Sequence, residues 1–404
     1  MLRKIKTKDL RLGMHLHELC GSWMDHPFWR SKFILTDPKE IQSLLESPIK
    51  EVWIDVSKGL DRAEETQGPT EKSTVEVLME AEVAQHARTP RPVSMSEELK
   101  RAAMICNKAR HAVVSMFQEV RMGKAISSEA AGELVEEISS SIMRNPGALI
   151  SLARLKTADD YTYMHSVAVC ALMVSLARQL DLDEHDVREA GMAGLLHDIG
   201  KAMMPMDVLN KPGKLTDDEF RIIKNHPLAG HRLLAEGKAA SDIVLDVCLH
   251  HHEKVDGTGY PHRLAGERIS LFARMGAVCD VYDAITSNRP YKTGWDPAES
   301  IRKMTEWSQS HFDERVFQAF VKSIGIYPTG SLVKLGSGRL AVVIEQSEKS
   351  LLAPLVKVFF STRSKTYIPP EMIDLSRPGV TEKIVGRENA AIWGIKNLDD
   401  LWGN

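Results

Sequence analysis

Histidine and aspartate side chains recur through the middle of this chain at positions that could serve one site. His197 and Asp198 are adjacent in the segment His-Asp-Ile-Gly-Lys, and Lys201 follows one helical turn later. The other candidates lie on both sides of this pair: His165, His226, the run His250–His252, and Asp280. Imidazole and carboxylate groups bind first-row divalent metals, and none of the five cysteines forms a Cys-x-x-Cys pair. The pattern predicts a metal site without thiolate ligands, which argues against structural zinc.

These candidates are too many for one metal ion. A catalytic ion that keeps an open position uses three or four protein ligands. Successive residues of a helix point about 100° apart, so His250, His251 and His252 cannot all face the same site. With two of these three, seven ligands remain, which suits two ions about 3.5–4 Å apart with a bridging carboxylate such as Asp198. Such a pair activates a hydroxide for in-line attack on a phosphodiester.

Several separate helices must carry these side chains. Apolar periodicity predicts helices over 162–181, 184–200, 216–236, 240–253, 270–287 and 297–308. Residues 150–328 therefore form an expected all-α domain in which facing helices direct ligands inward. We assign the apolar stripe on the first of these helices to the core: Ala168, Ala171, Leu172, Ser175 and Leu176.

The segments before this domain differ in character. Residues 1–60 predict a small α+β unit, with a strand at 32–35, a helix from Asp37 and a strand at 51–56. Residues 61–93 contain few apolar side chains and read as a linker. Two amphipathic helices fill 94–149, where they either cover the helical domain or form a connector for signalling or dimerisation.

The last segment, 329–404, is rich in β-forming residues. Short apolar runs at 330–335, 341–345 and 356–360 predict three strands. The chain is thus expected to be multidomain and mainly α, with a small α+β N-terminal domain and a β-rich C-terminal extension.

Composition limits the class of protein and its location. The 404 residues are 43% hydrophobic and carry a net charge of −3, which gives no general affinity for nucleic acids or membrane surfaces. An anionic ligand must therefore meet local positive charge, for which we identify Lys201, Arg289 and Lys292. The chain has no apolar run of membrane-helix length, no signal-peptide pattern and five scattered cysteines, so we expect a cytoplasmic protein.

The order of these motifs resembles the HD-GYP family, a bacterial branch of the HD-domain phosphohydrolases. The match covers about residues 150–328 and includes His251-His252-Glu253 followed by Asp256–Pro261, which reads Asp-Gly-Thr-Gly-Tyr-Pro. Residues 1–60 resemble the domain of unknown function that often precedes HD-GYP domains. The resemblance implies an HD-type fold and a complete ligand set: His165, His197, Asp198, His226, His251, His252 and Asp280. It leaves His250 outside that set, and Asp283, one turn after Asp280, is expected to orient a ligating histidine.

The resemblance also implies an activity. It is the metal-dependent hydrolysis of cyclic di-GMP, a bacterial second messenger, with pGpG or GMP as the end product. Two divalent ions, iron or manganese, are the expected cofactors. Some relatives hold a third metal through a glutamate four residues before the first histidine, but that position is Tyr161 here. The implied catalytic groups are Asp198 and Lys201, and the implied substrate contacts are Asp159, Lys201, Tyr260, Arg289 and Lys292.

Partners and alternatives follow from the same resemblance. In this family the Gly-Tyr-Pro loop is implicated in partner contacts, so a diguanylate cyclase or an adaptor protein is an expected partner, and a homodimer is an expected assembly. A catalytically silent cyclic di-GMP sensor or docking module is the alternative function, although every ligand and the loop are present. A third hypothesis, an HD phosphohydrolase acting on a mononucleotide, is disfavoured by the Gly-Tyr-Pro segment and by Arg289-Pro290-Tyr291.

Overall fold

The computed structural model describes residues 2–19, 32–36, 38–47, 49–59, 91–155, 161–211, 213–237, 240–288, 294–347 and 349–402. The chain divides into two compact units. The first comprises Met1–Arg88 with Glu348–Ser350, and the second comprises Thr89–Ser347 with Leu351–Asn404. In the described ranges, no helix combines the length and apolar character needed to cross a membrane.

The first unit contains a four-stranded antiparallel sheet and one helix. Its elements are β1 (Leu2–Lys6), β2 (His15–Leu19), β3 (Phe33–Ile34), α1 (Pro38–Glu46) and β4 (Glu51–Asp55), with strand order β1-β4-β2-β3. The predicted strands at 32–35 and 51–56 and the predicted helix correspond to β3, β4 and α1. Strands β1 and β2 were not predicted; β1 is largely exposed and rich in lysine and arginine, so its apolar alternation is weak.

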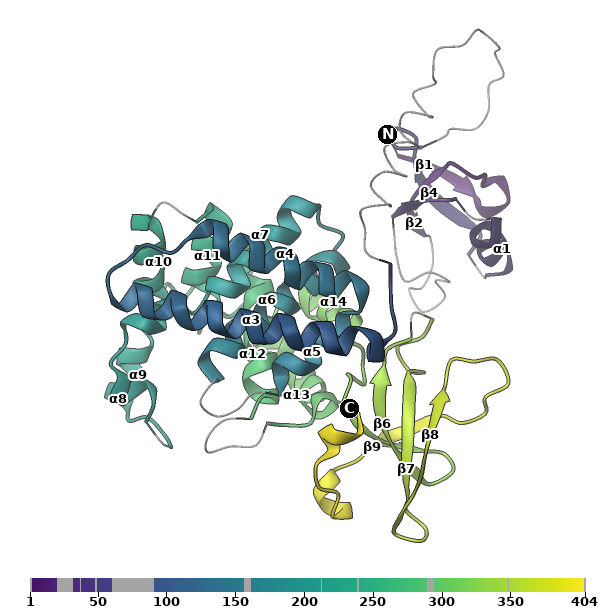
Figure 1. The fold of residues 1–404 in the computed structure, drawn as a ribbon. Helices are drawn as coiled ribbons and strands as arrows, with labels where there is room; N and C mark the ends of the chain where they lie inside the picture. The colour runs from purple at the N-terminus through teal and green to yellow at the C-terminus, as the bar shows by residue number, and fades with distance from the viewer. Residues whose placement is uncertain are drawn as a thin grey trace. The chain divides into compact units, whose positions relative to one another are not determined.

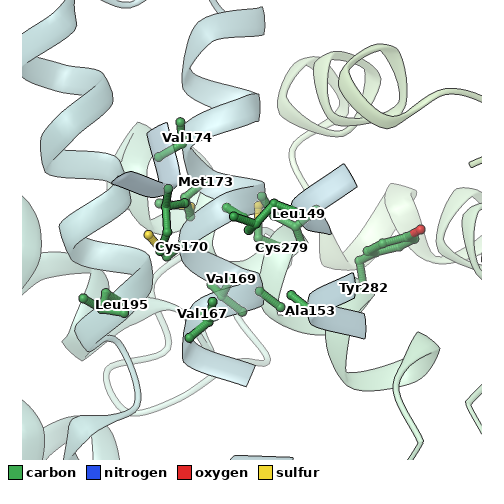
Figure 2. Close-up of a cluster of buried hydrophobic side chains, with 14 of the residues drawn as sticks. Leu149, Ala153, Val167, Val169, Cys170, Met173, Val174, Leu195, Cys279 and Tyr282 are labelled. Carbon is green, nitrogen blue, oxygen red and sulfur yellow. The ribbon is translucent and has the colours of Figure 1, made fainter. Parts of the chain in front are cut away.

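Helix α6 (Tyr161–Gln179) lies at the centre of the second unit (Figure 1). The helices that contact it are α3 (Met95–Arg121), α4 (Ser128–Arg144), α5 (Pro146–Arg154), α7 (Glu184–Leu196), α12 (Leu271–Thr286) and α14 (Glu314–Ile324). Every residue from Met164 to Ala177 is buried, as expected for a helix enclosed on all sides. The stripe assigned to the core is therefore core. Figure 2 shows side chains of α6, including Cys170 and Met173, beside Leu149 of α5 and Cys279 of α12.

Further helices lie along the chain between α7 and α14. They are the 3-10 helices η3 (Ile199–Met203) and η4 (Gly266–Arg268), and α8 (Met206–Leu209), α9 (Asp217–Ile223), α10 (His226–Gly237), α11 (Asp242–His250) and α13 (Pro297–His311). The predicted helix 184–200 instead ends at Leu196, so the His-Asp pair lies in a turn. The predicted helix 216–236 is two helices, because Pro227, which lacks an N–H, occupies the first turn of α10. Helix α14 was not predicted.

Helices α3 and α4 share the hydrophobic core of α6 and α7. Glu98 of α3 is fully buried and accepts hydrogen bonds from Ser141 Oγ at 2.8 Å and from Arg144 Nε and Nη2, each at 2.7 Å. At the other end of α3, Arg121 Nε donates to the carbonyl of Ala202, which follows Lys201. Of the two interpretations of residues 94–149, this packing favours helices that cover the helical domain. It does not favour a separate connector.

The C-terminal segment forms a five-stranded antiparallel sheet in the order β8-β7-β6-β5-β9. Its strands are β5 (Leu332–Leu335), β6 (Arg339–Glu345), β7 (Leu355–Ser361), β8 (Thr366–Asp374) and β9 (Ile384–Arg387). Two short 3-10 helices, η5 (Ala390–Trp393) and η6 (Leu398–Leu401), follow β9. Leu340, Val342 and Phe359 join the core of the helices, and alternate residues such as Val343 form a separate cluster. The prediction lacked the two edge strands; β8 contains Pro369 and Pro370, which edge strands tolerate. The mainly α, multidomain fold class is confirmed.

Candidate metal centre

The structure brings all seven predicted ligands together from five helices of the second unit. His165 lies near the start of α6, and His197 and Asp198 lie in the turn after α7. The other four lie at the start of α10, just after α11 and within α12: His226, His251, His252 and Asp280. All are buried except His252, whose side chain is 23% exposed. Five histidines and two aspartates thus meet in the interior of the helical domain, with His252 on the partly exposed side.

Three overlapping groups of ligand atoms form within this set, and the third, made of His197, Asp198 and His251, joins the other two. The first group is His165, His197 and Asp280, whose ligand atoms all lie within 4.8 Å of one another. His165 Nε2 is 3.0 Å and His197 Nε2 is 4.0 Å from Asp280 Oδ1. We call this group the first cluster.

The second cluster is His226, His251 and His252, whose ligand atoms meet the same limit of 4.8 Å. The Nε2 atoms of His226 and His251 are 3.3 Å apart. His252 Nδ1 is 3.6 Å from Asp280 Oδ2, which connects this cluster to the first.

Asp198 lies between the clusters and presents one oxygen to each. Its Oδ2 is 3.5 Å from the Nε2 atoms of both His165 and His197. Its Oδ1 is 3.1 Å from His226 Nε2 and 3.8 Å from His251 Nε2. This is the geometry of a carboxylate that can bridge two ions.

Backbone contacts select the tautomer of three of the histidines. The Nδ1 atoms of His197, His226 and His251 face the carbonyls of Gly194 at 2.8 Å, Ile223 at 2.7 Å and Val247 at 3.0 Å. Because a carbonyl only accepts, each Nδ1 must carry the proton and each Nε2 presents its lone pair to the centre.

The arrangement of lone pairs fits metal ions. Two nitrogens bound to one ion at about 2.1 Å lie roughly 3.0–3.4 Å apart, and the Nε2 atoms of His226 and His251 are 3.3 Å apart. Within the described part of the chain, His197 Nε2 and Asp198 Oδ1 are buried without a hydrogen-bond partner. Buried acceptors that face one another require a cation, so the donor set is suited to two divalent metals.

At five of the seven ligands, the electrostatic environment favours the protonation state that binds a metal. Burial lowers the pKa of His197 and His251, and it lowers the pKa of His252 to about 3. Burial opposes ionisation of Asp198, but Lys201 and the neighbouring histidines outweigh it and hold the pKa of that carboxyl well below its usual range. For Asp280, burial is likewise outweighed, mainly by His165, and its pKa is also well below the usual range. Neutral imidazoles and ionised carboxylates are the ligand forms.

Asp283 orients His165 from outside the centre. Its Oδ2 is 2.6 Å from His165 Nδ1, and Ser287 Oγ donates to its Oδ1 at 3.1 Å. Burial lowers the pKa of His165, but hydrogen bonds and charge from Asp280 and Asp283 outweigh it and raise the pKa. The expected outer contact of Asp283 with a ligating histidine is therefore present in the structure.

His250 lies outside the two clusters, as the helical periodicity requires for one of the three histidines. Its Nδ1 is 2.7 Å from Asp246 Oδ1, and its Nε2 is 3.0 Å from His262 Nδ1. The neighbouring Glu253 is buried and accepts from the backbone N–H groups of His262 at 2.7 Å and Leu264 at 3.0 Å. Glu253 thereby holds the loop that follows the histidine run.

Two glycines allow η3 and α10 to approach closely. A Cβ atom on Gly200 would lie 1.9 Å from the carbonyl oxygen of His226 and 2.5 Å from the nitrogen of Gly230. This close approach, whose partner Gly230 the sequence did not reveal, sets the distance between the His-Asp turn and His226.

The loop Asp256–Pro261 places Tyr260 against the second cluster. The Tyr260 ring stacks on His252 with centroids 4.7 Å apart, and its backbone N–H donates to the His252 carbonyl at 3.2 Å. Burial raises the pKa of the Tyr260 hydroxyl, which stays protonated. Lys224 Nζ lies 4.9 Å from the centroid of the same ring, a contact that the sequence analysis missed because nothing local distinguishes this lysine from a surface lysine.

The structure describes two of the predicted substrate contacts. Lys201 Nζ forms an ion pair with Asp198 Oδ2. Tyr260 stacks on His252 beside the second cluster. The other three, Asp159, Arg289 and Lys292, lie outside the described residues.

Comparisons with known proteins agree with this picture. The HD domain family matches residues 138–316, and the domain of unknown function DUF3391 matches residues 2–131. A Pseudomonas aeruginosa protein named cyclic di-GMP phosphodiesterase PA4108 is 58% identical over 403 residues, which are 100% of this chain and 96% of that protein. The Xanthomonas campestris cyclic di-GMP phosphodiesterase response regulator RpfG is 39% identical over 179 residues, 43% of this chain and 47% of that protein.

Among solved structures, the HDG"Y"P protein Bd1817 from Bdellovibrio bacteriovorus aligns with a TM-score of 0.47 and 16% identity. The alignment covers 79% of this chain and 98% of that one.

The helical domain with a His-Asp pair between two clusters defines an HD-domain protein of the metal-dependent phosphohydrolase class. The similarity to the Pseudomonas protein extends over the whole chain and includes the Gly-Tyr-Pro loop region. The chain belongs to the HD-GYP family, with a DUF3391 domain preceding the HD domain.

Proposed function

We propose that this protein is a metal-dependent phosphodiesterase that hydrolyses the 3'-5' phosphodiester of cyclic di-GMP to pGpG, with GMP as a further product to be tested. The observation that supports the reaction is Asp198, which presents one carboxylate oxygen to each cluster. The support for the substrate is the name of the relative that shares 58% of its residues with this chain.

We assign the metal-binding role to the two clusters and Asp198. Two bound divalent ions would supply a hydroxide nucleophile at neutral pH and neutralise the charge that develops on the phosphate. The nitrogen and oxygen donors suit iron or manganese, which we propose as the native metals. The chain's own contribution is to hold its ligands ionised or neutral as required and to exclude water from their outer sides.

Positive charge and the loop complete the proposed site. Lys201 keeps Asp198 ionised and brings a cation beside the bridging carboxylate. Tyr260 lies against His252, whose side chain is 23% exposed, and we propose that substrate enters on this side of the second cluster. From the sequence we further propose Asp159, Arg289 and Lys292 as substrate contacts, since phosphate recognition needs cations that the net charge of −3 does not supply.

We further propose that the protein acts in the cytoplasm, where four described cysteines, Cys106, Cys170, Cys248 and Cys279, remain buried free thiols. A diguanylate cyclase or an adaptor protein is the proposed partner of the Gly-Tyr-Pro loop, and a homodimer is the proposed assembly.

Purified without chelators, the protein is expected to contain about two equivalents of iron or manganese and to convert cyclic di-GMP to pGpG or GMP. Elemental analysis followed by chromatography of the products measures both. Treatment with a chelator should abolish turnover and lower the melting temperature, because ions that bind only the folded state stabilise it. Full metal occupancy and tight dinucleotide binding without product would instead support the silent sensor.

Replacing Asp283 with asparagine is expected to lower metal affinity or turnover about 10- to 100-fold, since outer carboxylates fix the tautomer and basicity of a ligating histidine. Metal content under competing chelator and kcat should both be measured. Asp283→Glu keeps the charge and should recover part of the loss. Wild-type metal affinity in Asp283→Asn would show that His165 is positioned without this contact.

A further inference from the structure

Lys224 is a cation at the metal centre to which neither the sequence motifs nor the proposed mechanism gives a role. It occupies the junction between α9 and α10, two residues before His226, and its backbone N–H donates to the carbonyl of Phe220 at 3.0 Å. We propose that Lys224 binds the phosphate of the cyclic dinucleotide that is not attacked, and so selects substrates with a second phosphate. This proposal rests on the proposed function and adds a substrate-binding residue to it.

The side chain of Lys224 is held beside the second cluster by aromatic rings. Its Nζ is 4.9 Å from the centroid of Tyr260 and 4.8 Å from the centroid of Phe220. Tyr260 in turn stacks on His252 at 4.7 Å. Cation–π contacts orient an ammonium group while leaving its N–H donors available to an anion. The ammonium is therefore fixed in direction one ring away from a metal ligand.

The charge of Lys224 contacts aromatic rings but is not neutralised by a carboxylate of the described residues. In the same stretch of chain, Lys211 pairs with Glu219 at 2.7 Å and Arg221 pairs with Asp218. Across the ranges that the structure describes, no carboxylate pairs with Lys224, although its side chain is half-buried. Partly burying an unpaired ammonium costs free energy, which an anionic ligand would recover.

The substrate supplies a matching anion. A cyclic dinucleotide contains two phosphodiesters, and only one of them can sit on the paired metals at a time. Lys201 forms an ion pair with Asp198, which places this cation beside the proposed position of the attacked phosphate. Lys224 contacts Tyr260, and among the described residues no ion pair or hydrogen bond joins its side chain to the seven ligands. It therefore lies on the side of the centre toward which the second phosphate would extend.

The test compares two substrates on the metal-loaded full chain. Cyclic di-GMP carries two phosphodiesters, whereas bis(4-nitrophenyl) phosphate carries one. Lys224→Gln is expected to raise the KM for cyclic di-GMP about 10- to 100-fold, the value of a charge-assisted hydrogen bond. Its kcat/KM for bis(4-nitrophenyl) phosphate should fall much less than its kcat/KM for cyclic di-GMP. The ratio of the two kcat/KM values therefore changes. Lys224→Arg should restore most of the ratio.

Lys214→Gln is the matched control, because Lys214 is an exposed lysine in the loop before α9. It removes the same charge and should leave the ratio unchanged. An unchanged ratio in Lys224→Gln, equal losses on both substrates, or loss of bound metal would each overturn the proposal and indicate a structural lysine.

Failure of the proposed function gives a different result. If the wild-type chain hydrolyses neither substrate, calorimetric binding of cyclic di-GMP still tests Lys224. The proposal then requires binding at least about tenfold weaker in Lys224→Gln than in Lys214→Gln, and equal binding would overturn it.

Discussion

Asp198→Asn is expected to lose both metal ions and to reduce kcat by roughly three orders of magnitude or more. The substitution preserves the shape of the side chain, but it removes the negative charge and replaces one oxygen by an amide. Each cluster of three ligands would lose its shared anion, because Oδ1 faces His226 and Oδ2 faces His165. Elemental analysis and turnover of cyclic di-GMP measure the two losses, and circular dichroism should show that the helices remain.

The control for this substitution is Asp207→Asn, since Asp207 is exposed on α8. It makes the same chemical change outside the centre and should retain metal and activity. If Asp198→Asn kept one full equivalent of metal, Asp198 would belong to a single ion and the bridging assignment would be wrong. If it kept near-normal turnover, the proposed centre would not be the active site.

Gly200→Ala is expected to have the second large effect. The added methyl group would lie 1.9 Å from the His226 carbonyl oxygen, which is backbone and cannot rotate away. Helix α10 must therefore move, and overpacking of this kind costs about 1–3 kcal/mol or more of folding free energy. The displacement also carries His226 away from Asp198, so metal content should fall together with the melting temperature. Calorimetric unfolding and elemental analysis of the same sample measure both.

Gly237→Ala is the control for Gly200→Ala, because it adds the same methyl group to another glycine of this region. Gly237 ends α10, and a Cβ atom there would have no neighbour within 4 Å. Because alanine favours helix, the stability should stay equal or increase by up to about 1 kcal/mol. Equal metal content and melting temperature in Gly200→Ala and wild type would show that α10 adjusts without cost.

The candidate site could be predicted from the sequence because its chemistry depends on residue type. Histidine and carboxylate side chains are typical ligands of divalent metals, and the helical period excludes one residue of the run His250–His252. The structure finds His250 beside Asp246 instead. Lys224 gave no such signal, since its contact with Tyr260 joins two loops that are distant in sequence. The same reason hid the contact between Gly200 and Gly230, which no local pattern encodes.

The fold was predicted best where an element is largely buried and its sequence is largely apolar. Helix α6, buried on all sides, was predicted from its apolar length, and the buried strands β6 and β7 were predicted from their apolar runs. The edge strands β1 and β8 are mostly exposed, so their sequences carry no alternation. Helix α7 was predicted too long. It ends at Leu196, before the turn that carries His197, whereas helix propensity alone favours a helix that continues through this turn.

The order of the ligands along the chain has a consequence for how such a centre can change. The first cluster uses residues 165, 197 and 280, and the second cluster uses residues 226, 251 and 252, which are nested inside that span. Substitutions confined to His226, His251 and His252 would leave Asp198 and the three ligands of the first cluster in place. Loss of either outer helix, α6 or α12, would remove a first-cluster ligand and open the core around the second. Deletion of the nested stretch would likewise remove Leu234, Val244 and Val247 from that core, so the ligands of the second cluster can be lost by substitution but not by deletion.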